Sequence, residues 1–408
     1  MFLKKKKYIS SQSLSKLAWK KFKKNKIAIS SFYFLIFLFI VAILGYIITP
    51  DKTPYSNNQC LEIAAKPPGF SVTMLLIRKD EALKKTNFFS TMLFGKENIF
   101  EPIPIYNYHF SGDTITYEEY TGLNPNKGEL FSINIADAAY SFHINGGKPK
   151  ISGNNISFTN FEGQRITENI GVLTNFIKDN LIVKKRFLLG TDRYGRDLLS
   201  QIIIGARVSL SVGFISVFIS LILGILMGAL AGFFRGWIDN IIIWFINVVW
   251  SIPTLLLVIA ITFALGKGFW QVFVAVGLTM WVEVARVVRG QILSIREKDF
   301  IEAGRALGFK NFRIITRHIL PNVMGAVIVI SAANFASAIL IEAGLSFLGI
   351  GVQPPMPSWG TMIKEHYAYI ILDAPYLAIL PGVAIMITVL AFMLAGNGLR
   401  DALDVKIQ

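Results

Sequence analysis

The sequence is poor in charge. Only 16% of its 408 residues are Asp, Glu, Lys or Arg, whereas 53% are hydrophobic. A soluble globular domain has about 25% charged residues, so a soluble protein is nearly excluded. The chain also has a single cysteine, Cys60. One cysteine cannot form an intramolecular disulfide, so a disulfide scaffold is excluded as well.

Acidic side chains are absent from the first 26 residues, which carry ten lysines and therefore most of the net charge of +15. Because a long apolar run follows this basic segment, a membrane surface suits it better than nucleic acid, and we expect no nucleic-acid partner. The four histidines are scattered without metal-ligand spacing, so we expect no metal site. The ten lysines are Lys4, Lys5, Lys6, Lys7, Lys16, Lys20, Lys21, Lys23, Lys24 and Lys26.

The apolar runs predict an all-α polytopic membrane protein with six transmembrane helices. Residues 27–48 contain no charge and would cover about 33 Å as a helix, enough to cross the bilayer core. A signal peptide has a shorter apolar core and a small-residue cleavage site, so we expect an uncleaved anchor here. The other five runs are residues 208–233, 238–265, 269–288, 319–341 and 376–394.

Basic residues are concentrated after the second, fourth and sixth predicted spans. Because short loops rich in Lys and Arg stay on the cytoplasmic side, we expect both termini in the cytoplasm. The long segment between the first and second spans is then expected outside. The residues that set this orientation are Arg235, Arg286, Arg289, Arg296, Arg305, Arg313, Arg317 and Arg400.

Residues 49–206 form an insertion between the first and second spans, and its pattern predicts a β-rich structure. Residues 111–117 and 152–158 look alike: each begins with Ser-Gly-Asp or Ser-Gly-Asn and continues with alternating apolar residues. A glycine turn before an alternating strand is typical of a hairpin. The two stretches therefore predict two similar hairpins, and chance explains their likeness as well as a true internal repeat does.

Small residues recur every four positions in the second predicted span. This spacing places them on one face of a helix, where another helix backbone can approach closely. We expect this face to pack on a helix, either of the same chain or of a partner subunit. The face consists of Ser216, Ser220, Gly224, Gly228 and Gly232.

The loop between the fourth and fifth spans, residues 289–321, is long and charged. Ser294 begins a stretch with capping-box spacing, and Asp299 is a second candidate N-cap. Residues 300–307 have a helical pattern that Gly308 is expected to end in the left-handed conformation. Such a short amphipathic helix suits docking in a groove on another protein. We expect one side of it to carry Phe300, Ala303, Gly304 and Leu307.

This loop resembles the docking loop of the inner-membrane permease subunits of ATP-binding-cassette (ABC) importers, in the branch that carries dipeptides, oligopeptides and nickel. The family signature is Glu-Ala-Ala, three residues and Gly. Glu302, Ala303 and Gly308 match it, whereas Gly304 replaces the second Ala. That glycine loosens the helix by up to about 1 kcal/mol. The run that contains Pro321 resembles the form used by the peptide branch.

Further stretches resemble the same branch in the same order along the chain. Residues 190–197, Gly-Thr-Asp-Arg-Tyr-Gly-Arg-Asp, resemble its motif just outside the second span. The other matches are Trp19, Phe22, Asn25, Ala28 and residues 205–210, 346–355, 357–360 and 398–404. With the spans, they predict a basic cytoplasmic N-terminus at 1–26, a first transmembrane helix at 27–48, an extracytoplasmic insertion at 49–206, a permease domain of five helices at 207–396 and a cytoplasmic tail at 397–408.

The resemblance implies a transport subunit of the inner membrane and not an enzyme, so no catalytic residue is expected. Peptide would cross between this permease and a second homologous permease, in contact with membrane lipid, after delivery by an extracytoplasmic substrate-binding protein. Two cytoplasmic ATPases would bind ATP and Mg²⁺. The sequence contains no Gly-x-x-x-x-Gly-Lys-Ser/Thr loop to cradle phosphates, so we expect no cofactor in this chain.

Two glutamates lie near the ends of predicted spans, where ionisable groups are functional candidates. Glu283 has Arg286 one helical turn further on, and we favour a structural ion pair between them. Glu342 has two interpretations. It either lines the passage and meets a peptide's amino terminus, or hydrogen-bonds to the irregular segment of residues 344–351.

The charged residues before the second span also have two interpretations. They shape an outer gate of the translocation path, or they form a solvated turn fixed by Gly190 and Gly195. We favour the turn, because charged loops bounded by glycine are commonly exposed connections. The residues are Asp192, Arg193, Arg196 and Asp197.

Two alternative functions remain open. One is import of nickel or another small cargo by the same kind of complex. The other is a self-contained secondary transporter, for which six spans with internal glycines and glutamates would suffice. The amphipathic helix in the loop of residues 289–321 favours the ABC permease, because a self-contained carrier needs no docking helix there.

Overall fold

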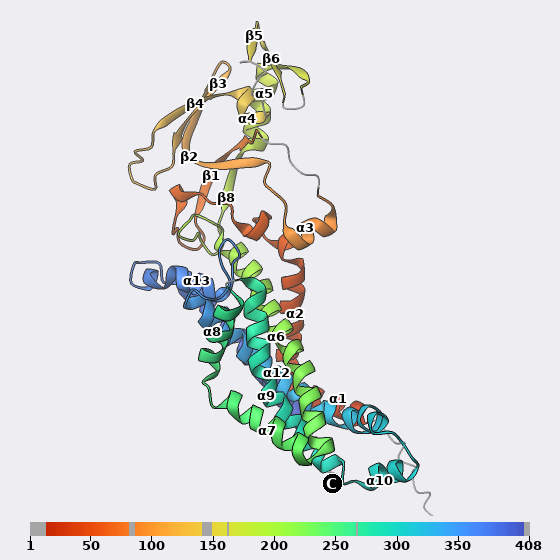
Figure 1. Ribbon diagram of the computed structural model, residues 1–408. Helices are drawn as coiled ribbons and strands as arrows, with labels where there is room; N and C mark the ends of the chain where they lie inside the picture. Colours follow the sequence, from red (N-terminus) through yellow and green to blue (C-terminus); the bar gives the residue numbers. More distant parts are fainter. Residues whose placement is uncertain (1–13, 81–85, 141–148, 161–162, 267, 404–408) are drawn as a thin grey trace, which may run out of the picture.

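The computed structural model describes residues 14–80, 86–140, 149–160, 163–266 and 268–403, so the basic residues 4–7 and the last residues of the predicted tail, 404–408, lie outside it. A bundle of long helices carries a β-rich unit at one end (Figure 1). Five helices are long and apolar enough to span a membrane: α2 (Lys26–Ile48), α6 (Leu198–Phe234), α9 (Phe269–Ile295), α12 (Leu320–Phe347) and α14 (Tyr376–Leu403).

The short helices lie at both ends of the bundle. Those of the bundle and its loops are α1 (Leu14–Lys24), α10 (Asp299–Ala306), α11 (Asn311–Arg313) and α13 (Trp359–His366), with a π turn at Ile314–Ile319 and a 3₁₀ turn at Tyr367–Ile370. Those of the β-rich unit are α3 (Phe88–Phe94), α4 (Ile135–Ala139) and α5 (Ile170–Phe176), with 3₁₀ turns at Pro54–Ser56 and Leu61–Ile63 and a π turn at Ile177–Leu181.

The helix α6 begins at Leu198, ten residues before the start predicted from hydropathy. The carboxylate of Asp197 caps it by accepting a 2.7 Å hydrogen bond from the Ser200 backbone N–H. Arg207, which interrupts the apolar pattern, lies inside the helix. Its Nη1 donates to the carbonyls of Met92 and Leu93 at the end of α3, so a charged residue is accommodated without ending α6.

The predicted third span is not a single helix, which corrects the expectation for residues 238–265. It is divided into α7 (Gly236–Trp250) and α8 (Thr254–Leu265), which are bent by 93°. Pro253 lies at the break; proline lacks an N–H and drives the preceding residue away from helical geometry. At about 22 Å and 18 Å, neither helix alone crosses a bilayer core of about 30 Å.

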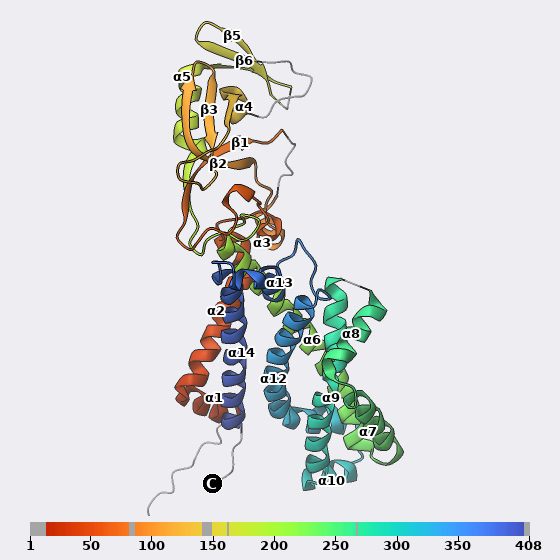
Figure 2. The ribbon, with the colours of Figure 1, turned by 90° about the vertical axis from the view of Figure 1, so that its left-hand side faces the viewer.

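The bent α7–α8 pair nevertheless returns the chain across the bundle. Gly224 of α6 lies against Val284 of α9, and Gly232 lies against Ile292. Residue numbers therefore rise in the same direction along both helices, so α6 and α9 run parallel. The chain must therefore go back between them, which gives six crossings in the described residues. As Figure 2 shows, α1, α10 and the end of α14 lie at the end of the bundle opposite the β-rich unit.

The insertion is β-rich, as the sequence predicts. Its five-stranded antiparallel sheet has the order β4-β3-β2-β1-β8, and a second antiparallel sheet has the order β5-β6-β7. The strands are β1 (Ser71–Arg78), β2 (Phe100–Ser111), β3 (Thr114–Glu119), β4 (Leu130–Asn134), β5 (Lys150–Ser152), β6 (Asn155–Thr159), β7 (Arg165–Asn169) and β8 (Ile182–Arg186).

Both predicted hairpins are confirmed, as β2–β3 and β5–β6. Gly112 and Gly153 occupy the same turn position, each with φ +62°, a value that glycine adopts at no steric cost. The fully buried side chains of Ile115 and Ile156 follow at equal spacing and enter one shared core.

The likeness of the two hairpins continues through the next strand and helix. Hydroxyl pairs join the strands at equivalent places, Thr116 with Ser132 at 2.8 Å and Ser157 with Thr167 at 2.9 Å. The last strand of each unit ends in an asparagine that caps a helix: Asn134 accepts from Ala136 N, and Asn169 accepts from Gly171 N. Agreement over three strands and a capped helix favours a true internal repeat over chance.

Candidate functional site

The predicted docking helix is present as α10, but neither predicted cap is used. Ser294 lies inside α9, and Asp299 is already the first residue of α10. The N-cap is Lys298, whose side chain makes no capping hydrogen bond. The first turn instead carries the acidic residues Asp299 and Glu302, whose charge suits the positive end of the helix dipole.

The end of α10 is closed by Gly308 in the left-handed conformation, with φ +75°. The N–H of Gly308 donates to the carbonyl of Arg305 at 2.9 Å, and the N–H of Phe309 donates to that of Gly304 at 3.1 Å. These two bonds form a Schellman motif, and the ring of Phe309 lies against Gly304. The helix is thus fixed at its C-terminal end by the signature glycine.

The inner side of α10 rests on the bundle. Ile301 is almost fully buried in a cluster that contains Phe233 of α6, Val288 of α9 and Val323 of α12. Arg296, just after α9, donates to the carbonyl of Phe233. The inner side of α10 therefore shares one apolar cluster with the ends of three long helices.

The outer side of α10 carries exposed apolar residues. Leu307 is 73% exposed, and Phe300 and Ala303 are also exposed. Gly304 was expected on the same side but faces inward, because the Schellman motif draws it against Phe309. Glu302 is exposed and makes no ion pair with any residue that the structure describes. The apolar patch is therefore open to a partner.

The continuation into α12 contains a π turn at Ile314–Ile319, which ends two residues before Pro321. A proline has no N–H to give to the carbonyl four residues earlier, and a wider turn is a common local adjustment. The side chain of Asn322 donates to the carbonyl of His318 at 2.7 Å. Pro321 thus marks the junction between the loop that contains α10 and the long helix α12.

The small-residue face of α6 packs on α9 of the same chain and not on another subunit. The hydroxyl of Ser216 donates to the carbonyl of Phe273 at 3.0 Å. A Cβ at Gly224 would lie 2.4 Å from Val284, and one at Gly228 would lie 2.5 Å from a backbone carbonyl. Only glycine permits this separation. The face also includes Ser220, which is fully buried, and Gly232.

Of the charged residues before α6, Asp192, Arg196 and Asp197 are buried and Arg193 is half-buried, so they do not form the solvated turn that we favour from the sequence. The Arg196 Nε lies 2.6 Å from Asp192 Oδ2, and its Nη2 lies 3.2 Å from Glu365 Oε2 in α13. Arg193 pairs more loosely with Glu365, at 3.6 Å. We call Asp192, Arg193, Arg196, Glu365 and His366 the outer polar cluster. It joins the loop at the base of the insertion to α13.

His366 is a member of this cluster that the sequence did not single out. Its Nδ1 faces the carbonyl of Met362 at 2.7 Å, and its Nε2 faces the backbone N–H of Arg193 at 3.5 Å. Because a carbonyl only accepts and an N–H only donates, the ring is neutral with its proton on Nδ1. Burial lowers the pKa of His366, against the opposing effect of the Asp192 and Glu365 carboxylates.

Glu342 of α12 is fully buried and makes two hydrogen bonds to hydroxyl groups. Its Oε1 accepts from Ser346 at 2.7 Å, and its Oε2 accepts from Ser209 of α6 at 3.0 Å. Ser346 also accepts the backbone N–H of Val352. Of the two interpretations of Glu342, the structure therefore contains the hydrogen bond to the irregular segment.

The predicted ion pair between Glu283 and Arg286 does not form. Arg286 instead donates to Asn247 Oδ1 at 3.0 Å and lies 3.5 Å from the centre of the Trp250 ring, both in α7. The next arginine, Arg289, makes a bidentate pair with Asp239 at 2.6 Å. The arginines of α9 therefore point towards α7 and hold the broken span, a role that their spacing within α9 alone did not indicate.

Comparison with known proteins gives the family. Residues 220–408 match the family described as binding-protein-dependent transport system inner membrane component, and residues 13–68 match the N-terminal transmembrane domain of oligopeptide transport permease C. A glutathione transport system permease protein, GsiD, from Pectobacterium atrosepticum is 42% identical over 220 residues, which cover 54% of this chain and 73% of that protein. The chain belongs to this permease family.

The permease is therefore a multi-pass inner-membrane component of an ABC transporter complex and is not itself an ATPase. A self-contained secondary transporter is excluded by this membership. A dipeptide transport system permease protein, DppC, from Alkalihalophilus pseudofirmus is 43% identical over 219 residues, covering 54% of this chain and 72% of that protein.

The β-strands of the insertion lie outside both family matches. Residues 69–219, between the two matched segments, contain all eight strands. Among solved structures, an inward-facing MetNI methionine ABC transporter chain is 21% identical, covers 50% of this chain and 97% of that chain, and has a TM-score of 0.43. That likeness is too low to carry an argument about the insertion or the transport path.

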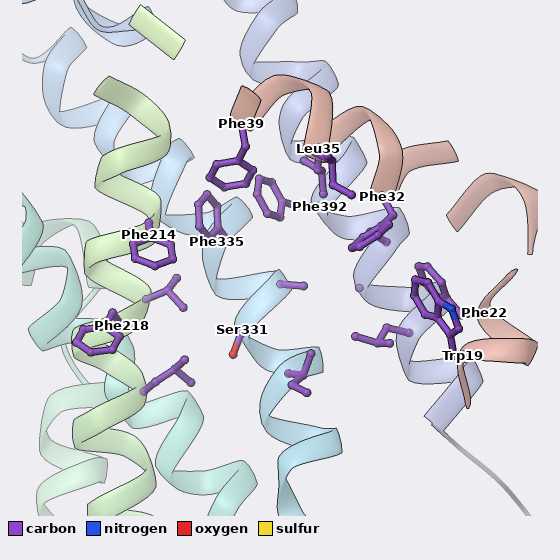
Figure 3. A pocket seen from close by; sticks show the side chains of 18 residues that line it. Trp19, Phe22, Phe32, Leu35, Phe39, Phe214, Phe218, Ser331, Phe335 and Phe392 are labelled. Carbon is purple, nitrogen blue, oxygen red and sulfur yellow. The ribbon is translucent and has the colours of Figure 1, made fainter. Parts of the chain in front are cut away.

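The permease also has an apolar groove of about 450 Å³ between α1, α2, α6, α12 and α14. Figure 3 shows Phe335 and Phe392 at its centre and Trp19 at one end. The ring centroids of Phe335 and Phe392 are 4.2 Å apart. Ser331 donates its hydroxyl to its own helix, to Val327 O. A peptide would find almost nothing there to hydrogen-bond its amides and charged ends, so this groove is not suited to peptide cargo.

Proposed function

We propose that this permease is one of two homologous transmembrane subunits of an ATP-driven importer of dipeptides or oligopeptides. The cargo is inferred from two relatives, whose names assign them to glutathione and dipeptide transport. Both substrates are short peptides. A periplasmic-type binding protein would deliver the peptide on the side of the insertion, where selection among peptides would begin.

The observation that carries this proposal is the exposed apolar side of α10. Phe300, Ala303 and Leu307 present a small hydrophobic patch, while Ile301 on the opposite side is buried in the bundle. A helix that is seated on three spans and open on its other face suits a groove on a cytoplasmic ATPase. ATP and Mg²⁺ would bind to two such ATPases, and closure between them would move α10 with the ends of α6, α9 and α12.

The proposed orientation places α10 and both chain ends in the cytoplasm. The basic residues of α1 and of the loops at the same end of the bundle support it, because such loops are retained on the inside. The β-rich insertion is then extracytoplasmic. There, an outer gate is proposed at Asp192, Arg193, Arg196 and Asp197, since their loop contacts α13 in the last connection before α14. Glu342 would brace this region from within the bundle.

Docking is tested by changing Leu307 to Asp in the assembled, reconstituted complex. A side chain at the centre of an interface contributes about 2 kcal/mol or more, which corresponds to about 30-fold in affinity. We expect the variant to lose ATPase subunits on purification and to lose ATP-driven uptake. The matched control is Leu130→Asp in β4, because Leu130 is 70% exposed and lies in the insertion. Equal uptake by the Leu307→Asp and Leu130→Asp complexes would refute the docking role.

Cargo is tested by uptake into proteoliposomes that contain the complete complex. We expect radiolabelled dipeptides or tripeptides to accumulate only with ATP and binding protein. Accumulation of nickel with no peptide uptake would replace the peptide assignment by the nickel branch of the family. Neither result depends on the Leu307 variant, so the cargo and docking proposals fail separately.

A further inference from the structure

The helix α3 in the insertion exposes an unusual amount of apolar surface. Four of its seven residues are large apolar side chains that point away from the protein. Phe89 is 71% exposed and Phe94 is 69% exposed. Contiguous exposed apolar side chains of this size mark a contact with a partner or with lipid. The four residues are Phe88, Phe89, Leu93 and Phe94.

The polarity of α3 is inverted relative to a helix in water. Its two hydroxyl residues, Ser90 and Thr91, are half-buried, whereas the phenyl rings of Phe88, Phe89 and Phe94 are exposed. A water-exposed helix on a protein surface places its apolar residues inwards and its polar residues outwards. The arrangement of α3 is therefore suited to an apolar surrounding.

The position of α3 is fixed at the level where the first span leaves the bundle. The Lys96 N–H, just after α3, donates to the Lys52 carbonyl at 2.8 Å, four residues after the end of α2. Gly95 has φ +81°, and a Cβ there would lie 2.8 Å from the same carbonyl. Figures 1 and 2 both show α3 beside the end of α2 that bears the insertion.

A second attachment fixes α3 to the other span at this level. The Arg207 guanidinium, near the start of α6, donates to the carbonyls of Met92 and Leu93 at 3.1 Å and 2.9 Å. These carbonyls lie in the last turn of α3, where the helix dipole favours a positive charge. Since α2 and α6 enter the membrane here, α3 is attached to both at the membrane boundary.

We propose that α3 is a membrane-surface anchor of the insertion. Its phenyl rings enter the lipid at the boundary between headgroups and acyl chains, in the leaflet that faces the insertion, as amphipathic interfacial helices do. The lipid is the occupant because α3 lies beside the end of the apolar first span α2, whose side chains Phe37 and Ile48 are also exposed. The anchor goes beyond peptide import and does not depend on the cargo.

The single cysteine makes a sharp test possible. Cys60 is buried and its thiol donates to Glu62, so Cys60→Ser keeps a donor and leaves a background without thiols. A nitroxide is attached at Phe89→Cys in the complete transporter in lipid nanodiscs. Its collision rates with oxygen, which concentrates in lipid, and with a water-soluble nickel chelate are then compared. The controls are Phe37→Cys in α2 and Ile151→Cys in β5, both exposed positions.

The expected result is that position 89 collides more often with oxygen than with the chelate, as position 37 does, whereas position 151 shows the reverse. A probe at 89 that behaves like the one at 151 would place α3 in water and overturn the proposal. A probe reached by neither reagent would place α3 under protein, such as the second permease, and would overturn it as well. If the Phe89→Cys complex does not assemble, Phe94→Cys gives the same comparison.

Discussion

Arg196 and Glu365 form a 3.2 Å ion pair between residues that are 169 positions apart in the chain. The same guanidinium lies 2.6 Å from Asp192 and donates to Asn57. One side chain therefore connects the start of the insertion, the loop before α6 and the helix α13. The side chain of Arg196 is only 7% exposed and that of Asp192 only 1%, so this ion pair is buried and the Asp192 carboxylate depends on Arg196 for its compensating charge.

Replacing Arg196 with Ala is expected to cost about 3–5 kcal/mol, because removing one member of a buried pair leaves the other charge uncompensated. Thermal unfolding of the detergent-solubilised permease measures this loss as a lower melting temperature. The control is Arg235→Ala, which breaks a pair with Glu297 between two exposed side chains and should cost at most about 1 kcal/mol. Equal stability of the two variants would mean that the outer polar cluster is not a structural connection.

Acid is expected to weaken the same region through His366. Burial lowers the pKa of the folded-state imidazole, whereas in the unfolded chain it is about 6.5. Below that pH the unfolded state binds a proton that the folded state does not. The free energy of unfolding therefore falls as pH drops below about 6.5, by at most about 1.4 kcal/mol per pH unit. Hydrogen exchange of the α13 amides between about pH 7.5 and 5.5 measures this fall in the free energy of unfolding.

The matched variant for this pH effect is His366→Gln. A glutamine amide has one donor group and one acceptor atom for Met362 and Arg193 but does not titrate in this range. Its α13 amides should exchange with a flatter pH dependence than those of the unmodified permease. The same slope in both proteins would assign the effect to other groups.

Restoring the family's alanine at position 304 is expected to tighten α10. A Cβ on Gly304 would lie 3.4 Å from the Phe309 ring, an ordinary contact, and alanine favours a helix over glycine by up to about 1 kcal/mol. Limited proteolysis of the loop should become slower by up to about fivefold. Gly308→Ala is the opposite control: at φ +75° a side chain costs about 1–2 kcal/mol. Faster cleavage of Gly304→Ala would contradict the geometry.

Features that depend on local spacing were predictable from the sequence. Gly308 ends α10, and the glycine turns at 112 and 153 begin hairpins, because each of these follows from a few adjacent residues. The small-residue face followed from a period of four, which places Ser216 and Gly224 on one side of α6 whatever lies opposite. The identity of the opposite helix was left open by the same reasoning.

Contacts between distant segments and bends inside apolar runs were not predictable. Ser209 and Glu342 are 133 positions apart, and nothing near either residue indicates the other. Hydropathy does not indicate the bend at Pro253, because it measures only how apolar the residues are. It takes no account of the backbone hydrogen bond that a proline removes, so residues 238–265 are predicted as one uninterrupted span. Hydropathy places the limit of a span at Arg207, although its long side chain reaches the carbonyls of α3 from within the helix.

Adding one methyl group to the small-residue face is expected to separate α6 from α9. A Cβ at Gly224 would lie 2.4 Å from the Val284 Cβ and 2.8 Å from the Trp281 carbonyl. A backbone cannot yield as a flexible side chain does, so Gly224→Ala should cost about 1–3 kcal/mol. Gly290→Ala in α9 is the matched control, because a Cβ there meets nothing within 4 Å and alanine favours the helix. Melting temperatures in detergent should fall for the first variant and hold or rise for the second; equal values would show that the two helices are not held at glycine distance.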